Sequence, residues 1–356
     1  MPPLDLSASS VDLTRTICDL PSVSGDELAL ADAIDQAVRA LPHLEVYRDG
    51  DTIVARTDLG RAQRVVIAGH IDTVPINANL PTRDIEIDGE AYLWGRGTVD
   101  MKAGVAVQLK LAAELSDPRV DLTWMWYDHE EVDADLNGLT RLARTRPDLF
   151  AGDFAILGEP SNGQVEGGCN GNLRAIVRTH GVRAHSARAW MGDNAIHAAA
   201  PILARLAGYE PQEIVVDGLA YREGLNAVRI GGGIAGNVIP DLCEVEVNYR
   251  FAPSRSIDEA IAHVTEVLAG FEVEVIDRAA GARPGLDAPL AQEFVAAVGA
   301  QPRPKYGWTD VARFSALGVP AVNYGPGDPS LAHHDQERVP LAQIADVERG
   351  LRAWLS

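Results

Sequence analysis

The fold follows from one stretch of sequence, Val65-Val66-Ile67-Ala68-Gly69-His70-Ile71-Asp72. Its apolar run predicts a short buried strand that ends at Gly69-His70. Similar runs recur at Leu122 to Tyr127, Phe154 to Leu157 and Val319 to Asn323. A helical pattern from Ala103 to Leu115 separates the first two runs. Strands that alternate with helices predict an α/β fold with a largely parallel sheet, in which ligands bind beyond the carboxyl ends of the strands.

A second helix is predicted near the N-terminus. Ser24-Gly25-Asp26-Glu27 has the spacing of a capping box, in which the side chains of Ser24 and Glu27 satisfy the first amides of a helix. Apolar residues at helical spacing follow, from Leu28 to Leu41.

Residues 172–284 have a different pattern. We expect a strand, a helix, two antiparallel strands and a second helix, at Leu173 to Arg178, Asn194 to Ala207, Asn226 to Ile230, Glu244 to Phe251 and Ile257 to Leu268. An α+β unit of this size can form a domain. We therefore expect it to be inserted between two parts of one catalytic domain, residues 1–171 and 285–356.

Composition excludes several classes of protein. The chain has 356 residues, of which 46% are hydrophobic, and 31 basic against 51 acidic residues give a net charge of −20. This charge makes nucleic acid or an anionic membrane surface a poor partner. The widely spaced cysteines are odd in number (Cys18, Cys169, Cys243), which argues against a disulfide framework. Met1-Pro2-Pro3-Leu4-Asp5 has no signal-peptide pattern, and no apolar run is long enough to span a membrane, so we expect a cytoplasmic protein.

Histidine and acidic residues gather after the predicted strands and in adjoining loops. They lie in five segments: Gly69 to Pro75, Gly95 to Lys102, Glu130-Glu131, Gly158 to Ser161 and Ala332 to Glu337. Histidines and carboxylates without thiolates suit zinc or cobalt. Two such ions, about 3.5–4 Å apart, can share a water and lower its pKa, while a separate carboxylate accepts the proton.

Each segment alone also has an ordinary structural explanation. A core histidine explains His70 equally well, and Asp72 and Asp100 both fit a turn. The pair Glu130-Glu131 fits a solvated surface, although it directly follows a strongly apolar strand. The occurrence of all five segments at strand ends or adjoining loops favours the metal-site hypothesis.

These segments resemble those of the zinc peptidase family that includes desuccinylases, acetylornithine deacetylase, aminoacylase and bacterial glutamate carboxypeptidase, the M20 family. The resemblance covers essentially the whole chain. It is strongest to desuccinylases of actinobacterial type, through four further segments: Gly181 to Arg188, Tyr221 to Leu225, Gly236 to Pro240 and Lys305 to Val311.

The resemblance implies two Zn²⁺ ions per subunit, which Co²⁺ can replace. His70, Asp100 and Glu159 would hold one ion. His333, Asp100 and Glu131 would hold the other, so that Asp100 bridges the pair. The family pattern also implies a cis peptide bond between Asp100 and the next residue.

Two further roles are implied beside the metals. Asp72 would orient His70 through its second ring nitrogen, and Glu130 would act as general base and acid. Aligning Glu337 with the glutamate of the family pattern identifies His333, rather than its neighbour, as the ligand. Gln336 then stands where the family has an aspartate or asparagine.

The resemblance also implies that the inserted domain is a ferredoxin-like lid that pairs two subunits into a homodimer. His185 would reach the neighbouring active site and stabilise an oxyanion. Asn237, Arg250 and Thr309 would contact the substrate, with Arg250 as a carboxylate clamp, although a structural salt bridge explains Arg250 too. An arginine pair that other desuccinylases carry near Cys169 is absent from this sequence.

The resemblance therefore implies hydrolysis of the amide of N-succinyl-LL-2,6-diaminopimelate to succinate and LL-2,6-diaminopimelate. Another amide hydrolase of the family is the alternative: an acetylornithine deacetylase, an aminoacylase or a carboxypeptidase. A zinc-binding protein without activity would be expected to lack a ligand or Glu130. A serine hydrolase would need a Gly-x-Ser-x-Gly elbow, which the sequence does not contain.

Overall fold

The computed structural model describes residues 4–356. The prediction about a signal peptide concerns Met1 to Asp5, and the first three of these residues lie outside the described range. The chain forms two compact units. The larger contains Met1–Gly167, Pro284–Arg303 and Arg313–Ser356, and the smaller contains Gly168–Arg283 and Pro304–Ala312. The sequence-based division at 172–284 placed residues 304–312 with the catalytic domain, whereas here they group with the smaller unit. The roles assigned to the two domains stay predictions.

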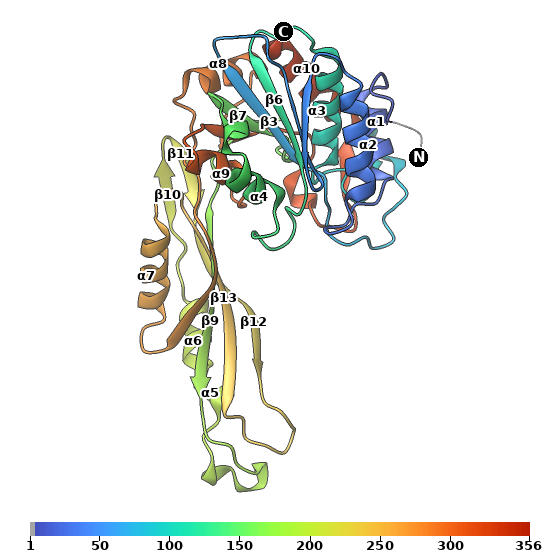
Figure 1. The fold of residues 1–356 in the computed structure, drawn as a ribbon. Coiled ribbons are helices and arrows are strands. Elements are labelled where there is room, and N and C mark those ends of the chain that lie inside the picture. Colours follow the sequence, from blue (N-terminus) through green and yellow to red (C-terminus); the bar gives the residue numbers. More distant parts are fainter. Residues whose placement is uncertain (1–3) are drawn as a thin grey trace. The chain divides into compact units, whose positions relative to one another are not determined.

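The larger unit is built on a mixed sheet with the strand order β1-β2-β6-β3-β7-β16-β8-β15. Figure 1 labels its central strands β6, β3 and β7. The central strands β6, β3, β7 and β16 are parallel, and β1, β2 and β8 are antiparallel to their neighbours. This confirms the predicted largely parallel α/β sheet. The strands are β1 (Glu45–Asp49), β2 (Thr52–Arg56), β3 (Arg64–His70), β6 (Asp121–Tyr127), β7 (Phe154–Leu157), β8 (Glu166–Gly167), β15 (Arg303–Pro304) and β16 (Ala321–Asn323). A small separate sheet has the order β17-β5-β4, with β4 (Arg83–Ile87), β5 (Glu90–Trp94) and β17 (Arg338–Pro340).

Helices cover both faces of the large sheet (Figure 1). The residues of β3 alternate between the faces: Val65 and Ile67 join the core formed with α1, α2, α3, α8 and α10, while Val66 is buried on the other side. Burial on both faces explains why these strands are continuous apolar runs in the sequence. The helices are α1 (Ser10–Cys18), α2 (Leu28–Arg39), α3 (Lys102–Glu114), α4 (Gly138–Thr145), α8 (Pro289–Val298), α9 (Val311–Ala316) and α10 (Leu341–Leu355), with short 3-10 turns η1 (Pro147–Phe150) and η3 (Pro329–Leu331).

The smaller unit contains an antiparallel sheet with the order β12-β13-β9-β14. Chain order and sheet order together are those of a ferredoxin-like fold, as predicted. Its elements are β9 (Gly171–His180), η2 (Ser186–Met191), α5 (Ala195–Ala198), α6 (Ala200–Ala207), β12 (Gly224–Gly232), β13 (Leu242–Phe251), α7 (Ile257–Val267) and β14 (Glu272–Ala279). A hairpin of β10 (Glu213–Val216) and β11 (Leu219–Arg222) precedes β12.

Two local predictions were wrong. The helix expected from Asn194 to Ala207 is broken at Ala199, because Pro201 lies at the start of α6 and has no amide proton to continue α5. The capping box is absent: Glu27 is the N-cap of α2 but makes no capping bond with its side chain. Ser24 donates its hydroxyl elsewhere, to Asp72.

No helix within residues 4–356 combines the length and the apolar character that crossing a membrane requires. All three cysteines are free and buried.

Candidate metal centre

The predicted ligands come from loops at one edge of the large sheet. His70 is the last residue of β3, Glu131 lies four residues beyond β6, and Glu159 lies two residues beyond β7. Because these three strands are parallel, their carboxyl ends meet at the same edge. Asp100 just precedes α3, and His333 follows η3.

Asp100 lies between the two histidines. Its Oδ1 is 3.1 Å from His70 Nε2, and its Oδ2 is 3.3 Å from His333 Nε2. His333 Nε2 is also 2.9 Å from the Glu131 carboxylate, and His70 Nε2 is 4.0 Å from Glu159 Oε1. The structure thus brings all five predicted ligands together, with the two oxygens of Asp100 facing different histidines.

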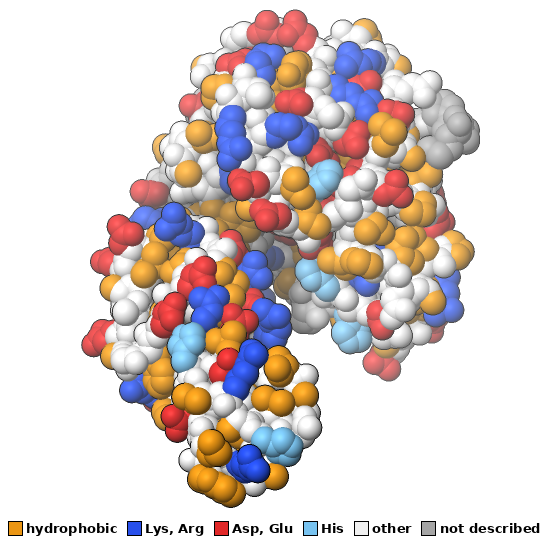
Figure 2. Space-filling view, turned by 60° about the horizontal axis from the view of Figure 1, so that its bottom comes forward, with side chains coloured by type: hydrophobic (Ala, Val, Ile, Leu, Met, Phe, Trp, Pro, Cys, Tyr) orange, Lys and Arg blue, Asp and Glu red, His pale blue; other side chains and the backbone are white. Residues whose placement is uncertain are grey.

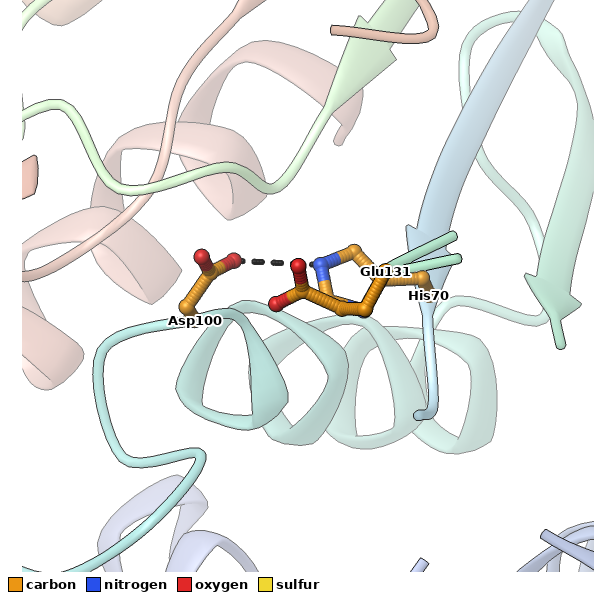
Figure 3. Close-up of side chains that lie close together, drawn as sticks. All are labelled: His70, Asp100 and Glu131. Carbon is orange, nitrogen blue, oxygen red and sulfur yellow. Dashed lines mark hydrogen bonds and ion pairs between the residues drawn. The ribbon is translucent and has the colours of Figure 1, made fainter. Parts of the chain in front are cut away.

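Three of these side chains form a compact donor group. One ligand atom from each of His70, Asp100 and Glu131 lies within 4.8 Å of the other two (Figure 3). Carboxylates this close together repel one another unless positive charge lies between them. Nitrogen and oxygen donors without thiolates fit zinc or cobalt. The group can hold a metal ion.

Without a metal, the side chains of the site shift one another's pKa values. Burial would lower the pKa of His70, but the carboxylates of Asp100 and Asp72 reverse this effect and hold that pKa well above its usual value. Hydrogen bonds with Asp100 and Glu131 raise the pKa of His333 to about 10. Burial would raise the pKa of Asp100, but both histidines hold it well below its usual value. Burial raises the pKa of Glu131 despite its bond with His333. Metal binding must therefore displace protons.

Asp72 has two tasks in this arrangement. His70 Nδ1 lies 3.0 Å from the backbone oxygen of Asp72 and 3.4 Å from its carboxylate, so the backbone is the nearer partner. The carboxylate itself accepts the amides of Glu130 and Glu131, each at 3.0 Å. Asp72 therefore connects the histidine to the turn that carries both glutamates.

Glu337 holds the loop that carries Asp100. Its Oε1 accepts the amides of Val99 (2.9 Å) and Asp100 (3.1 Å), and its Oε2 accepts a bond from Arg96 (2.7 Å). Burial raises the pKa of the Glu337 carboxyl. The predicted cis bond between Asp100 and Met101 is present.

A close backbone contact fixes Glu159. A Cβ added to Gly104 of α3 would lie 2.1 Å from the carbonyl oxygen of Gly158, and one added to Gly325 would lie 2.2 Å from the same oxygen. Only glycine at both positions lets α3 and the loop after β16 pack against the peptide that precedes Glu159.

The predicted residues of the smaller unit form two groups. His185 and Asn237 lie together, since the Asn237 carbonyl accepts the Ser186 amide at 2.9 Å, and both residues are exposed. Arg250 lies at the opposite end of β13, about 27 Å from Leu242 at a strand rise of about 3.4 Å per residue. Thr309 is buried, and its carbonyl oxygen accepts a bond from the Cys169 thiol, two residues before β9, on which Asn172 pairs with Arg250. One sheet therefore holds the two groups far apart.

Sequence reasoning missed the roles of Ser24 and Glu27, which contact the site instead of capping α2, and the backbone contacts of Glu337. The place of Glu337 in the family pattern could have indicated its backbone contacts.

Comparison with known proteins identifies relatives of the whole chain. The model of peptidase family M20/M25/M40 matches residues 66–356. The chain is 49% identical over 366 residues to the succinyl-diaminopimelate desuccinylase of Corynebacterium glutamicum, covering 100% of this chain and 98% of that protein. It is 52% identical over 355 residues to a DapE protein of Mycobacterium tuberculosis, covering 99% of each. A dinuclear metal-binding M20 peptidase of Bacillus subtilis shares the fold, with a TM-score of 0.71 at 16% identity over 97% of this chain and 96% of that one.

Proposed function

We propose, from the premise that this chain belongs to peptidase family M20/M25/M40, that it hydrolyses N-succinyl-LL-2,6-diaminopimelate to succinate and LL-2,6-diaminopimelate. Full-length identity to named desuccinylases supports this substrate. The convergence of His70, Glu131, Glu159 and His333 around Asp100 is the single structural observation that carries the chemistry.

Two zinc ions fit the donor set, with Asp100 shared between His70 and Glu159 on one side and His333 and Glu131 on the other. The division follows from the two Asp100 oxygens, each of which faces a different histidine. When bound, such a pair lowers the pKa of a shared water and polarises the amide carbonyl. Cobalt, which accepts the same ligands, would replace zinc.

Glu130 is the general base in this proposal. It takes the proton of the attacking water and passes it to the leaving amine. Asp72 keeps Glu130 in place by accepting its backbone amide at 3.0 Å. His185 donates to the oxygen of the tetrahedral intermediate, where a pre-aimed donor contributes about 3–4 kcal/mol.

Arg250 binds a substrate carboxylate, with Asn237 and Thr309 as further contacts. The Arg250 guanidinium is half-buried and uses Nε to donate to Asn248 at 3.2 Å, which leaves its Nη groups for a bidentate pair. Burial lowers its pKa, and a bound carboxylate would relieve that cost.

The active unit is a homodimer joined through the smaller unit. Strand β12 is an edge strand, and Val228 and Ile230 on it are 57% and 48% exposed. Ile234 and Ile196 beside it are 68% and 40% exposed, and hydrophobic side chains are visible on the surface of this unit in Figure 2. An exposed apolar edge favours pairing with a second copy, which supports the dimer.

In this proposal, His185 of one subunit serves the metal centre of the other. A mixing experiment tests this. We expect the Glu130→Gln and His185→Ala proteins each to lose most of their activity, whereas their mixed dimer holds one complete site and recovers activity. Absence of recovery after subunit exchange, verified by tagged subunits, would contradict the shared site.

We also place the protein in the cytoplasm. Its three free, buried cysteines agree with a reducing compartment.

The substrate is tested by measuring amine release from succinyl-diaminopimelate, acetylornithine and a dipeptide, side by side, on zinc-loaded protein. We expect kcat/KM for the first to exceed the others by at least about a hundredfold, because its succinyl group carries an additional carboxylate that the acetyl group lacks, and a site that pairs with such a group rejects substrates without it. Preference for another substrate would assign a different activity within the family. Activity that survives complete removal of metal would overturn the mechanism.

A further inference from the structure

The turn that carries Glu130 and Glu131 is held by its backbone. Three consecutive amides donate to buried carboxylates: that of His129 to Glu27 Oε1 at 3.2 Å, and the next two to Asp72 at 3.0 Å each. Glu27 and Asp72 are both completely buried. The direction of the Glu130 and Glu131 side chains therefore depends on where these two carboxylates lie.

Both carboxylates are fixed by residues of one segment, Ser22 to Glu27. The Ser24 hydroxyl donates to Asp72 Oδ2 at 2.6 Å, on the oxygen that also accepts the Glu131 amide. Glu27 uses its other oxygen to accept the amide of Gly25 at 2.9 Å. Neither side chain is used to cap α2, although their spacing is that of a capping box.

The same segment is attached to the chain just beyond His70. The amide of Thr73 donates to the Ser22 carbonyl at 3.0 Å, and the amide of Ser24 donates to the Thr73 carbonyl at 3.1 Å. The Ser22 hydroxyl donates to the carbonyl of Ile71 at 2.5 Å. A histidine ligand and the glutamate turn are thus tied to one another through a third piece of chain.

We propose that Ser24 and Glu27 are positioning residues, which hold the Glu130–Glu131 turn in register with His70. This inference rests on the proposed function for its effect on turnover. Its effect on metal binding through Glu131 does not require that the substrate be correct.

The chemistry of the two side chains predicts what substitution does. Ser24→Ala removes the hydroxyl donor from Asp72 and leaves that carboxylate oxygen with the Glu131 amide alone. Glu27→Gln preserves shape, but an amide nitrogen then faces either the Gly25 or the His129 amide, which are both donors. Loss of such supporting contacts costs about 10–100-fold in metal affinity or activity.

The chain offers a matched control at the other end of β6. Asp121 is also buried and accepts two backbone amides, from Leu59 and Arg61 at 2.8 Å each, together with the Thr57 hydroxyl at 2.9 Å. Asp121→Asn therefore makes the same kind of change away from the sheet edge that carries the ligands.

The experiment uses full-length protein and measures three quantities for each variant: Co²⁺ affinity by visible absorption, kcat and KM with succinyl-diaminopimelate, and the melting temperature. We expect Ser24→Ala and Glu27→Gln to weaken binding of one Co²⁺ and to lower kcat, each about 10–100-fold, with KM changed less than about threefold. Ser24→Thr, which keeps the hydroxyl, should recover both. Asp121→Asn should lower the melting temperature but leave Co²⁺ affinity and kcat near wild type.

Two results would overturn the inference. One is Co²⁺ affinity and kcat within twofold of wild type in Ser24→Ala, a variant that removes a single oxygen and tests the idea even if Glu27→Gln does not fold. The other is an equal loss in Asp121→Asn, which would make the effect a general loss of stability. If wild type fails to cleave the substrate, the proposed function fails, and the Co²⁺ measurement still decides the positioning role.

Discussion

The two units neutralise their carboxylates in different ways. On the sheet of the smaller unit, Arg178 contacts Glu244 at 2.8 Å and also Glu274, and Arg229 contacts Glu246 at 3.0 Å. At the carboxyl edge of the large sheet, the ion pairs found for Asp100 and Glu131 within residues 4–356 are with histidines. A metal ion can displace the proton of a histidine and bind its ring nitrogen, whereas arginine stays protonated. The carboxylates on the smaller sheet are therefore neutralised without a metal, whereas those at the edge of the large sheet can bind cations.

The largest effect is expected for Asp100→Asn, which removes the carboxylate that contacts both histidines. The amide keeps one acceptor oxygen and loses the charge, so we expect loss of both metal ions and a fall in kcat beyond about 10⁴-fold. Elemental analysis after dialysis gives the metal content. Two retained equivalents of metal per subunit would contradict the bridging role.

Glu130→Gln tests the proposal that Glu130 transfers the proton while other carboxylates hold metal. We expect kcat to fall by about 10²–10⁴-fold, because the proton acceptor is gone, while metal content stays at the wild-type level. Steady-state kinetics and elemental analysis on the same sample provide the check. A kcat near wild type would rule out Glu130 as the base.

The pH dependence of metal binding sharpens the contrast between histidine and arginine pairs. With its pKa raised to about 10, His333 is protonated at neutral pH in the metal-free protein and releases its proton when metal binds. Apparent affinity should therefore fall as pH falls, by about tenfold per pH unit for each proton displaced. Competition titrations with a chelator from pH 6.5 to 8.5 measure this slope. The slope should become shallower in His333→Ala, and an equal slope would show that other groups release the protons.

The smallest effect is expected on the sheet of the smaller unit. Glu244→Gln removes one partner of Arg178 in a partly exposed ion pair, and Arg178 keeps Glu274 as a second partner, so the free energy of unfolding should change by less than about 1 kcal/mol. Metal content should not change. Denaturant unfolding measures the first quantity, and a loss of several kcal/mol would mean that the arginine pairs matter as much as the metal edge.

The positions of the proposed ligand residues could be predicted because each follows an apolar run or stands in a short motif near one. His70 and Glu131 follow strands whose burial on both faces leaves an unmistakable pattern in the sequence. Once the strands are parallel, their ends must meet, and the site follows from topology.

The supporting contacts could not be predicted in the same way. The spacing of Ser24 and Glu27 satisfies a local capping rule, and the competing partner Asp72 is 48 residues from Ser24. A tertiary hydrogen bond to a buried carboxylate outweighed the local one, and sequence spacing carries no sign of that choice. The break at Ala199 could have been predicted, because Pro201 lacks the amide proton that would continue α5.

The two histidines differ greatly in access: His70 is 1% exposed and His333 is 54% exposed. A metal ion that enters from solvent would reach His333 before His70, and so would a chelator. If two ions bind as proposed, withdrawal of metal should proceed in two kinetic phases, with a half-loaded species between them that keeps the ion beside His70. Enzyme isolated under zinc limitation would accumulate in that state, and brief exposure to zinc would return it to full occupancy.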